Sequence, residues 1–146
     1  MIIGFGLLKM NAERKALEIP LNIQTQNTLR ITNITEKPIL SFSKEKALEI
    51  TFSFRVDYLP NIANIELTGN MLYKADDKFR EMILKEWEKT KKLNPTFSTQ
   101  VTNHALAKCN IRALQLAQQL NLPPHIPFPR ITTITKDEKP AGKKSK

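Results

Sequence analysis

The 146-residue sequence has little of several residue types on which common sites depend. It contains one cysteine, Cys109, and four glycines. A single cysteine excludes an intramolecular disulfide, and no closely spaced Cys or His pairs form a zinc-binding pattern. No glycine-rich loop joins a strand to a helix and no G-x-S-x-G sequence occurs, so phosphate-cradling and serine-nucleophile motifs are absent. We therefore predict a protein that is not an enzyme, with no catalytic residue, metal site or cofactor.

Long apolar runs are also missing. No stretch offers the about 18 consecutive apolar residues that a membrane-spanning helix requires. The first ten residues, MIIGFGLLKM, are apolar but lack the charged leader and the small-residue cleavage site of a signal peptide. We therefore expect a cytoplasmic protein that does not insert into membranes.

Acidic residues are outnumbered, since 23 Lys and Arg against 14 Asp and Glu give a net charge of +9. Residues 136–146 hold +3 of this excess and no large apolar side chain. We predict one domain over 1–131 followed by a basic, disordered tail at 132–146. Elsewhere the basic residues are scattered, and the densest run, over 85–92, interleaves four lysines with two glutamates. Such mixing is typical of a solvated face rather than of a nucleic-acid footprint.

The clearest pattern is the alternation LEITFSFRVDY over 48–58, in which every even position is apolar. A period of two indicates an extended strand with one face buried and the other in water. The alternation returns in NIELTGNMLY, after Pro60 and Asn61. Two half-buried strands joined by a short turn predict an antiparallel hairpin.

Further extended segments are expected before this hairpin. Residues 3–7 alternate, and a polar stretch, NAERK, follows at 11–15 and interrupts the pattern. Residues 29–34 predict another strand, with a slip near Asn33 that indicates a bulge. Residues 17–23 alternate as well, but Pro20 restricts them to an edge strand or an extended crossover.

Helical spacing begins after Asp76 or Asp77, either of which is a good N-cap. The first helix should end near Leu93, because Asn94-Pro95 cannot continue it. A second, longer helix should begin at Thr96 or Ser98 and run to about Leu120.

The second helix carries a stripe of mainly small residues that permits close approach of another element: Val101, Ala105, Cys109, Ala113 and Leu116. Cys109 on this stripe is expected to be a packing residue. Other apolar residues, such as Ile111, predict burial on a second side as well. Strands followed by helices indicate an α+β fold, with an antiparallel sheet of about four strands followed by two helices packed on one face.

The segment LPPHIPFPRI, at 122–131, contains four prolines that force an extended path. It carries two large apolar residues, Ile126 and Phe128, while Trp87 lies on the first helix. These side chains either pack on their own domain or line an exposed groove or a subunit interface. His125 in the same segment is expected to be structural.

The stretch NIRALQLAQQ followed by LNLPPHIPF, over 110–128, resembles the end of the long helix in the SecB family of export chaperones. The order of elements over residues 2–131 also resembles the SecB layout. This resemblance implies an ATP-independent holdase that binds unfolded, apolar polypeptides in surface grooves of a homo-oligomer, a dimer or a tetramer. The candidate client-binding residues are Trp87, Phe97, Ile126 and Phe128.

The charge departs from the SecB pattern. SecB proteins are acidic and meet the export ATPase SecA through acidic groups on the sheet, whereas this chain is basic. We therefore do not extend SecA binding to it. The Lys- and Ile-rich composition suits a thermophilic source and an archaeal branch of the family. The alternatives are a nucleic-acid-binding α+β domain that uses the scattered lysines and the basic tail, and a small enzyme without known motifs.

Overall fold

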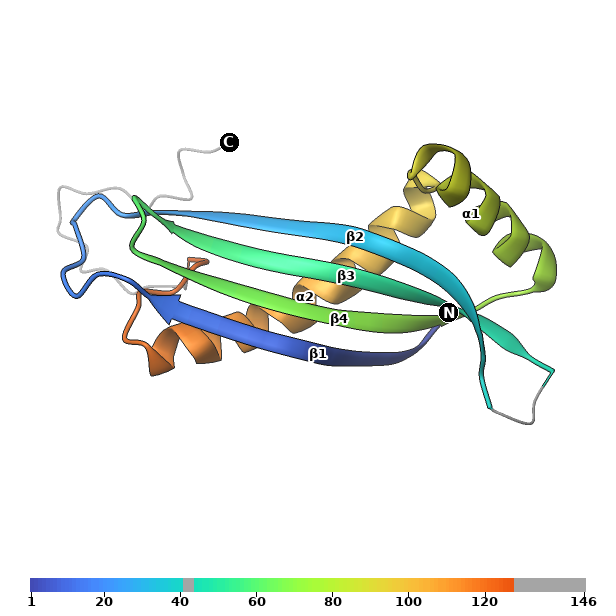
Figure 1. The fold of residues 1–146 in the computed structure, drawn as a ribbon, viewed down its shortest axis with the longest axis horizontal. Coiled ribbons are helices and arrows are strands. Elements are labelled where there is room, and N and C mark those ends of the chain that lie inside the picture. The colour runs from blue at the N-terminus through green and yellow to red at the C-terminus, as the bar shows by residue number, and fades with distance from the viewer. Residues whose placement is uncertain (41–43, 128–146) are drawn as a thin grey trace, which may run out of the picture.

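Four strands of one antiparallel sheet precede two helices in this computed structural model, which describes residues 1–40 and 44–127. The elements are β1 (Ile2–Arg14), β2 (Gln24–Pro38), β3 (Lys46–Leu59), β4 (Ala63–Lys74), α1 (Asp77–Thr90) and α2 (Pro95–Gln119). The strand order β1-β4-β3-β2 places β1 and β2 at the two edges (Figure 1). The predicted α+β class is confirmed. Phe128 and the predicted tail at 132–146 lie outside the described residues.

The central strand β3 has the two faces that its alternation predicts. Phe52 and Phe54 are fully buried, whereas Ser53 and Arg55 between and after them are partly exposed. A turn with a cis Leu59–Pro60 bond and a left-handed Asn61 joins β3 to β4. The predicted hairpin is therefore confirmed, and its apolar face forms the centre of the core.

Gly69 in β4 makes room for an aromatic pair on this face. A Cβ atom at position 69 would lie 2.9 Å from Cζ of Phe52, and it would also meet the backbone of Gly6 in β1. Phe52 stacks on Phe5 of β1, with ring centroids 5.3 Å apart. A side chain at position 69 would therefore disturb both the β1–β4 pairing and the aromatic stack.

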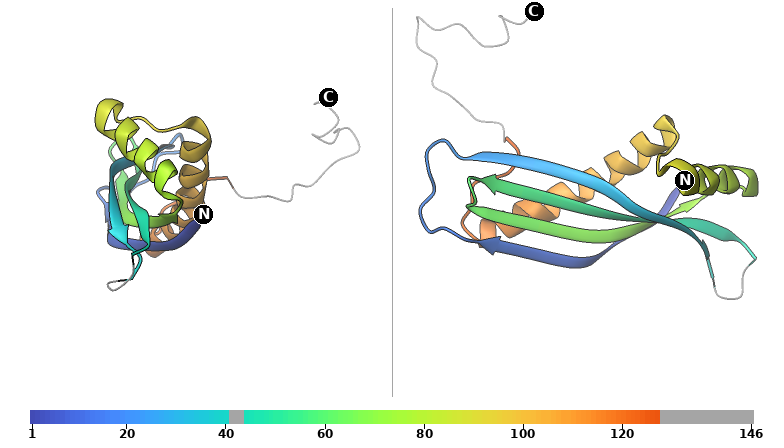
Figure 2. Two further views of the ribbon diagram at one scale, coloured as in Figure 1. Left: turned by 90° about the vertical axis from the view of Figure 1, so that its right-hand side faces the viewer. Right: turned by 45° about the horizontal axis from the view of Figure 1, so that its top comes forward.

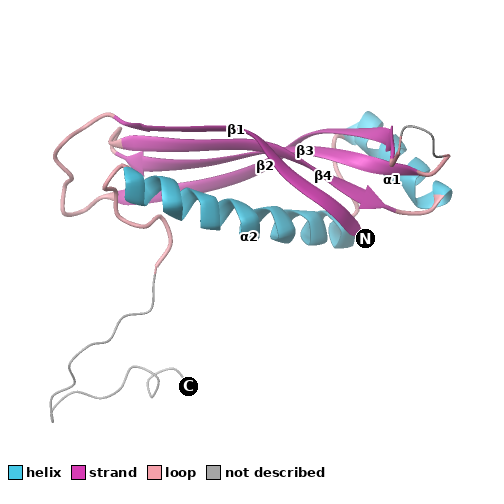
Figure 3. Ribbon diagram, turned by 90° about the horizontal axis from the view of Figure 1, so that it is seen from below, coloured by secondary structure: helices cyan, strands magenta, loops and turns pink. Residues whose placement is uncertain are grey.

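The long helix α2 lies along one face of the sheet (Figure 3). Its buried residues recur every four positions: Phe97, Val101, Ala105, Cys109, Ala113 and Ala117. The predicted stripe is thus present, but Ala117 takes the place of Leu116, which is half-buried. The expected burial of a second side was wrong, because Ile111 is 61% exposed. One side of the helix fills the core and the other faces solvent.

The shorter helix α1 lies at one end of the sheet, beside β2 (Figure 1). Asp76 caps it by accepting a hydrogen bond from the Phe79 amide at 2.8 Å. It ends at Thr90, before the predicted Leu93, because Lys91 adopts a left-handed conformation. Arg80 fixes the helix to β2 through an ion pair with Glu36, with Nε and Oε2 2.8 Å apart. Arg80 is buried, and a second ion pair with Asp77, at 2.6 Å, also compensates its charge.

The connection between β1 and β2 crosses from one edge of the sheet to the other (Figure 2). Residues 15–23 therefore form the extended crossover and not an edge strand. The expected interruption at 11–15 was wrong, because β1 continues to Arg14 after a register shift between Leu7 and Lys9. The predicted bulge in β2 is confirmed by the register shift between Ile31 and Asn33.

Arg14 joins this crossover to the end of α2. Its guanidinium donates hydrogen bonds to the carbonyl oxygens of Leu120, at 2.9 Å, and Asn121, at 3.1 Å. Carbonyl groups at a helix C-terminus have no partner within the helix, and a cation there is favourable. Arg14 thus holds the crossover and the C-terminal end of α2 together.

We expect Phe54→Asp to unfold the protein, because the new carboxylate would be buried without a partner. Ser53→Asp is the matched control on the solvent side of the same strand, opposite Arg30. It should change the free energy of unfolding by less than about 1 kcal/mol. Urea denaturation followed by circular dichroism measures both. Equal losses would mean that both faces of β3 are buried.

We expect the Cys109 thiol to react with a disulfide reagent only as fast as the protein unfolds. Burial raises the pKa of Cys109 to about 11, so the thiol is protonated at neutral pH. Cys109→Ala should cost about 1–2 kcal/mol of stability through the cavity it leaves. Rapid labelling of the folded protein, followed by absorbance, would contradict this packing role.

Candidate functional site

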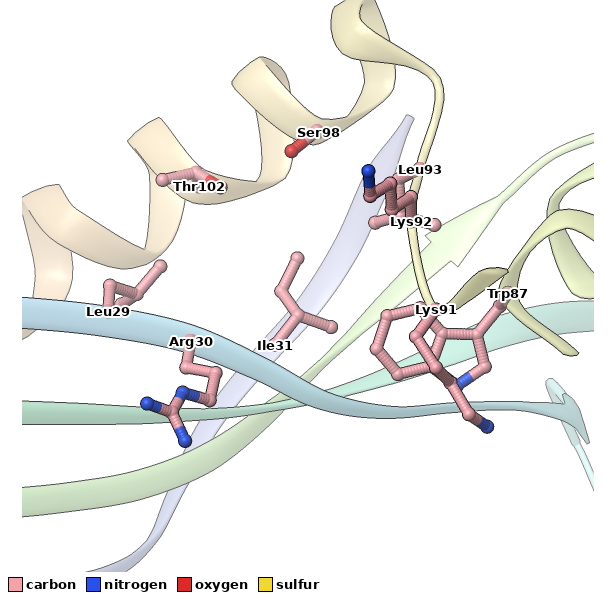
Figure 4. A pocket seen from close by; sticks show the side chains of 9 residues that line it. All are labelled: Leu29, Arg30, Ile31, Trp87, Lys91, Lys92, Leu93, Ser98 and Thr102. Atoms are coloured by element: carbon pink, nitrogen blue, oxygen red, sulfur yellow. The ribbon is translucent and has the colours of Figure 1, made fainter. Parts of the chain in front are cut away.

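The first groove, here named the Trp87 groove, lies between β2, the end of α1 and the N-terminal part of α2 (Figure 4). Its volume is about 450 Å³. Its lining residues are Leu29, Arg30, Ile31, Trp87, Lys91, Lys92, Leu93, Ser98 and Thr102. Edge strand β2, the α1–α2 loop and both helices thus contribute to one groove. Its apolar residues come from β2, α1 and the loop, and its polar or charged residues come from β2, the loop and α2.

A second groove, here named the β1 groove, lies between β1 and the C-terminal half of α2 and has a volume of about 510 Å³. Its lining residues are Phe5, Gly6, Leu7, Met10, Lys108, Ile111, Arg112 and Gln115. Met10 and Ile111 are 50% and 61% exposed, so this groove opens directly onto the surface. The two grooves therefore adjoin opposite edge strands of the sheet.

Trp87 is the main aromatic surface of the first groove. The side chain is 9% exposed, and no residue of the described chain accepts a hydrogen bond from its indole Nε1. Lys91 Nζ lies 5.4 Å from the ring centroid, which is a cation–π geometry. A buried N–H without a partner costs about 1–3 kcal/mol.

Cations without carboxylate partners surround the Trp87 groove. Within residues 1–40 and 44–127, neither Lys91 nor Lys92 forms an ion pair, and no carboxylate lines the groove. In Figure 4 the Lys92 ammonium extends toward Ser98 and Thr102, whereas Lys91 extends past the indole. Arg30 leaves the opposite side of β2. The electrostatic potential is therefore positive near each of the two lysines, beside the apolar residues of the groove.

Phe97 lies beneath this region and does not line the groove. It is 2% exposed, and its ring contacts Tyr73 and Phe79 edge to face, with centroids 4.9 Å and 5.5 Å away. Asn94 fixes the start of α2 above it, because its side chain accepts hydrogen bonds from the Thr96 and Phe97 amides. Phe97 thus supports the end of α2 from the core.

Ile126 lies in the segment 122–127, beyond the C-terminal end of α2 and at the opposite end of the molecule from α1 (Figure 1). His125 holds this segment, with its Nε2 2.8 Å from Asn110 Oδ1. Tyr58 donates a hydrogen bond to the Pro123 carbonyl at 2.5 Å. The four predicted client-binding residues therefore do not form one site. Trp87 and Phe97 share one end, Ile126 lies at the other, and Phe128 lies outside the described residues.

Most residues of the Trp87 groove were missed by the sequence analysis. Leu29 and Ile31 were recognised only as strand residues, and Ser98 only as a possible helix start. Their common signal is weak, because the groove forms where β2 meets α1 and α2, which lie far from it in the sequence.

The face of the sheet opposite α2 is polar and its charges are largely paired. Arg55 contacts Asp57 at 2.9 Å and Glu66 at 2.8 Å. Glu49 pairs with Lys37 at 3.4 Å. In the described part of the chain, no three His, Cys, Asp or Glu side chains gather as metal ligands would. None of its helices is long and apolar enough to cross a membrane.

Comparison with known proteins bears on the fold. No protein-family model matches the chain, and no curated protein sequence matches it. A solved structure of the SecB-like chaperone Rv1957 of Mycobacterium tuberculosis, in complex with a ChAD peptide from the Rv1956 HigA1 antitoxin, superposes with a TM-score of 0.52. The fold is SecB-like. The two sequences are 15% identical, and the match covers 90% of each chain.

We expect the protein to lose stability as the pH falls below about 6.5, because burial lowers the pKa of His125 from that value. The unfolded chain then binds a proton that the folded chain resists, so the stabilisation is complete above this pH and declines below it. His125→Gln should flatten the decline between about pH 7.5 and 5.5, measured by urea denaturation. His104→Gln is the control, and this variant should show the same decline as the unsubstituted protein. Identical slopes in all three proteins would exclude His125 as the cause.

Proposed function

We propose that this chain is an ATP-independent holdase-type chaperone that captures unfolded, apolar polypeptide segments in the Trp87 groove. The observation that carries the proposal is an open groove on a SecB-like fold, in which apolar residues lie beside polar and charged ones. The SecB-like neighbour was solved with a bound peptide, which supports a peptide-binding role for the fold. The clients would be unfolded polypeptides, and the site would act by binding alone.

The construction of the groove suits an extended chain. Strand β2 is an edge strand, so its outer backbone groups can pair with an added strand. Leu29, Ile31 and Leu93 beside it offer apolar contact. Burying client apolar surface contributes roughly 25 cal/mol per Å². Because backbone pairing and apolar contact do not demand one sequence, affinity would extend over many clients.

We also propose that the protein forms a homo-oligomer, a dimer or a tetramer. Edge strand β1 carries Leu8, 66% exposed, and Met10, 50% exposed, and Met10 lines the β1 groove together with the exposed Ile111 of α2. An apolar surface of this kind is typical of an interface, and a second copy covering the β1 groove would leave the Trp87 groove open. Light scattering coupled to size-exclusion chromatography measures the assembly, and a strictly monomeric protein would contradict it.

We expect the purified protein to delay aggregation of a chemically denatured client without ATP, and Leu93→Gln to weaken this activity several-fold. Leu93 lines the groove, so a polar side chain there reduces apolar contact. Met82→Gln is the matched control, because Met82 is exposed on α1 outside the groove. Light scattering of the client follows aggregation. Trp87 is the only tryptophan, so its emission reports on the groove directly.

Three outcomes would contradict the proposal. A wild-type protein that delays aggregation of no client would exclude a holdase. Equal loss in Leu93→Gln and Met82→Gln would place binding elsewhere. Binding to an oligonucleotide that falls steeply with salt, without any effect on clients, would favour the nucleic-acid alternative, because counterion release drives phosphate binding.

A further inference from the structure

The charges of the Trp87 groove restrict which apolar segments it can accept. We infer that this groove selects apolar peptide segments that carry an acidic residue. The inference rests on the peptide-binding function proposed above and names the class of client. It follows from two features of the groove: two lysines without an ion pair among the described residues, and the absence of a lining carboxylate.

Two positions along the groove suit a carboxylate. Near the indole, an oxygen can accept a hydrogen bond from Lys91 Nζ, which lies 5.4 Å from the ring centroid. Over the apolar floor, an oxygen can accept from Lys92 and from the hydroxyl of Ser98, toward which Lys92 extends in Figure 4. Hydrogen bonds between charged groups are stronger than neutral ones. The aliphatic or aromatic neighbours of the acidic residue would cover Leu29 and Ile31.

Other occupants fit these charges less well. A basic segment would bring like charges against Lys91 and Lys92, which costs affinity. The C-terminal sequence of this chain, 136–146, carries +3 and is disfavoured for the same reason. A nucleic acid requires several cations along its backbone and exposed ring faces for stacking. Two ammonium groups and a Trp87 side chain that is 9% exposed offer neither.

Three labelled peptides test the preference. They share one apolar sequence and differ at two positions, which hold Asp, Asn or Lys. We expect the Asp peptide to bind about five- to tenfold more tightly than the Asn peptide at low salt, and the Lys peptide to bind most weakly. Fluorescence anisotropy gives the affinities, and Trp87 emission should shift with each bound peptide. Equal affinity for all three peptides would overturn the inference.

A pair of double variants locates the effect. Lys91→Gln with Lys92→Gln should reduce the ratio of Asp to Asn affinity to about one, mainly through lower affinity for the Asp peptide. Lys78→Gln with Lys85→Gln removes the same charge from the side of α1 opposite Trp87, so the ratio should persist. Equal loss of the ratio in both double variants would show a long-range charge effect, which overturns the groove as the selector.

The controls separate this inference from the proposed function. If none of the three peptides binds, the peptide-binding function fails. If the Asn peptide binds but Asp gives no gain, only the acidic preference fails. An oligonucleotide that displaces the Asp peptide and depends on Lys91 and Lys92 in the same way would assign the site to phosphate and overturn the inference.

Discussion

The close packing of α2 on the aromatic face of the sheet is the contact on which the remaining structure depends. Phe52, Phe54 and Tyr58 fill this face, so only a helix with small residues can approach it. Ala105, Cys109, Ala113 and Ala117 provide that surface. Interiors are packed densely, so a larger side chain on the stripe would push the helix away and open the core.

The same packing creates the surfaces available for binding. A single helix is narrower than a four-stranded sheet, so α2 leaves a groove on each side, one toward β2 and one toward β1. Helix α1 closes the end of the first groove, held in place by Arg80 and Glu36. The crossover and Arg14 hold the other end of α2. Two uncovered edge strands then lie beside two grooves, an arrangement suited to extended polypeptides and to self-association.

The charges of this chain are arranged differently on the outer sheet face and in the Trp87 groove. On the outer sheet face, ion pairs such as Arg55 with Asp57 balance most charges. In the Trp87 groove, Lys91 and Lys92 have no such partner in the described part of the chain. The net charge of +9 therefore does not act equally over the whole surface. Only cations that lack an ion-pair partner and lie beside apolar residues can discriminate among ligands.

Local patterns in the sequence determined the elements, because alternation and helical spacing record which side of each element is buried. The β3–β4 hairpin, the bulge near Asn33, the Asp76 cap and most of the α2 stripe follow from them. These patterns did not predict the full length of β1. The polar half of this strand pairs with β4 although its side chains face water. The tertiary structure alone decided that Phe97 is buried and that the segment 122–127 lies at the opposite end of the molecule from α1. It also decided that Leu29 meets Lys92 and Ser98 across one groove, because that proximity depends on how distant elements pack rather than on any local period.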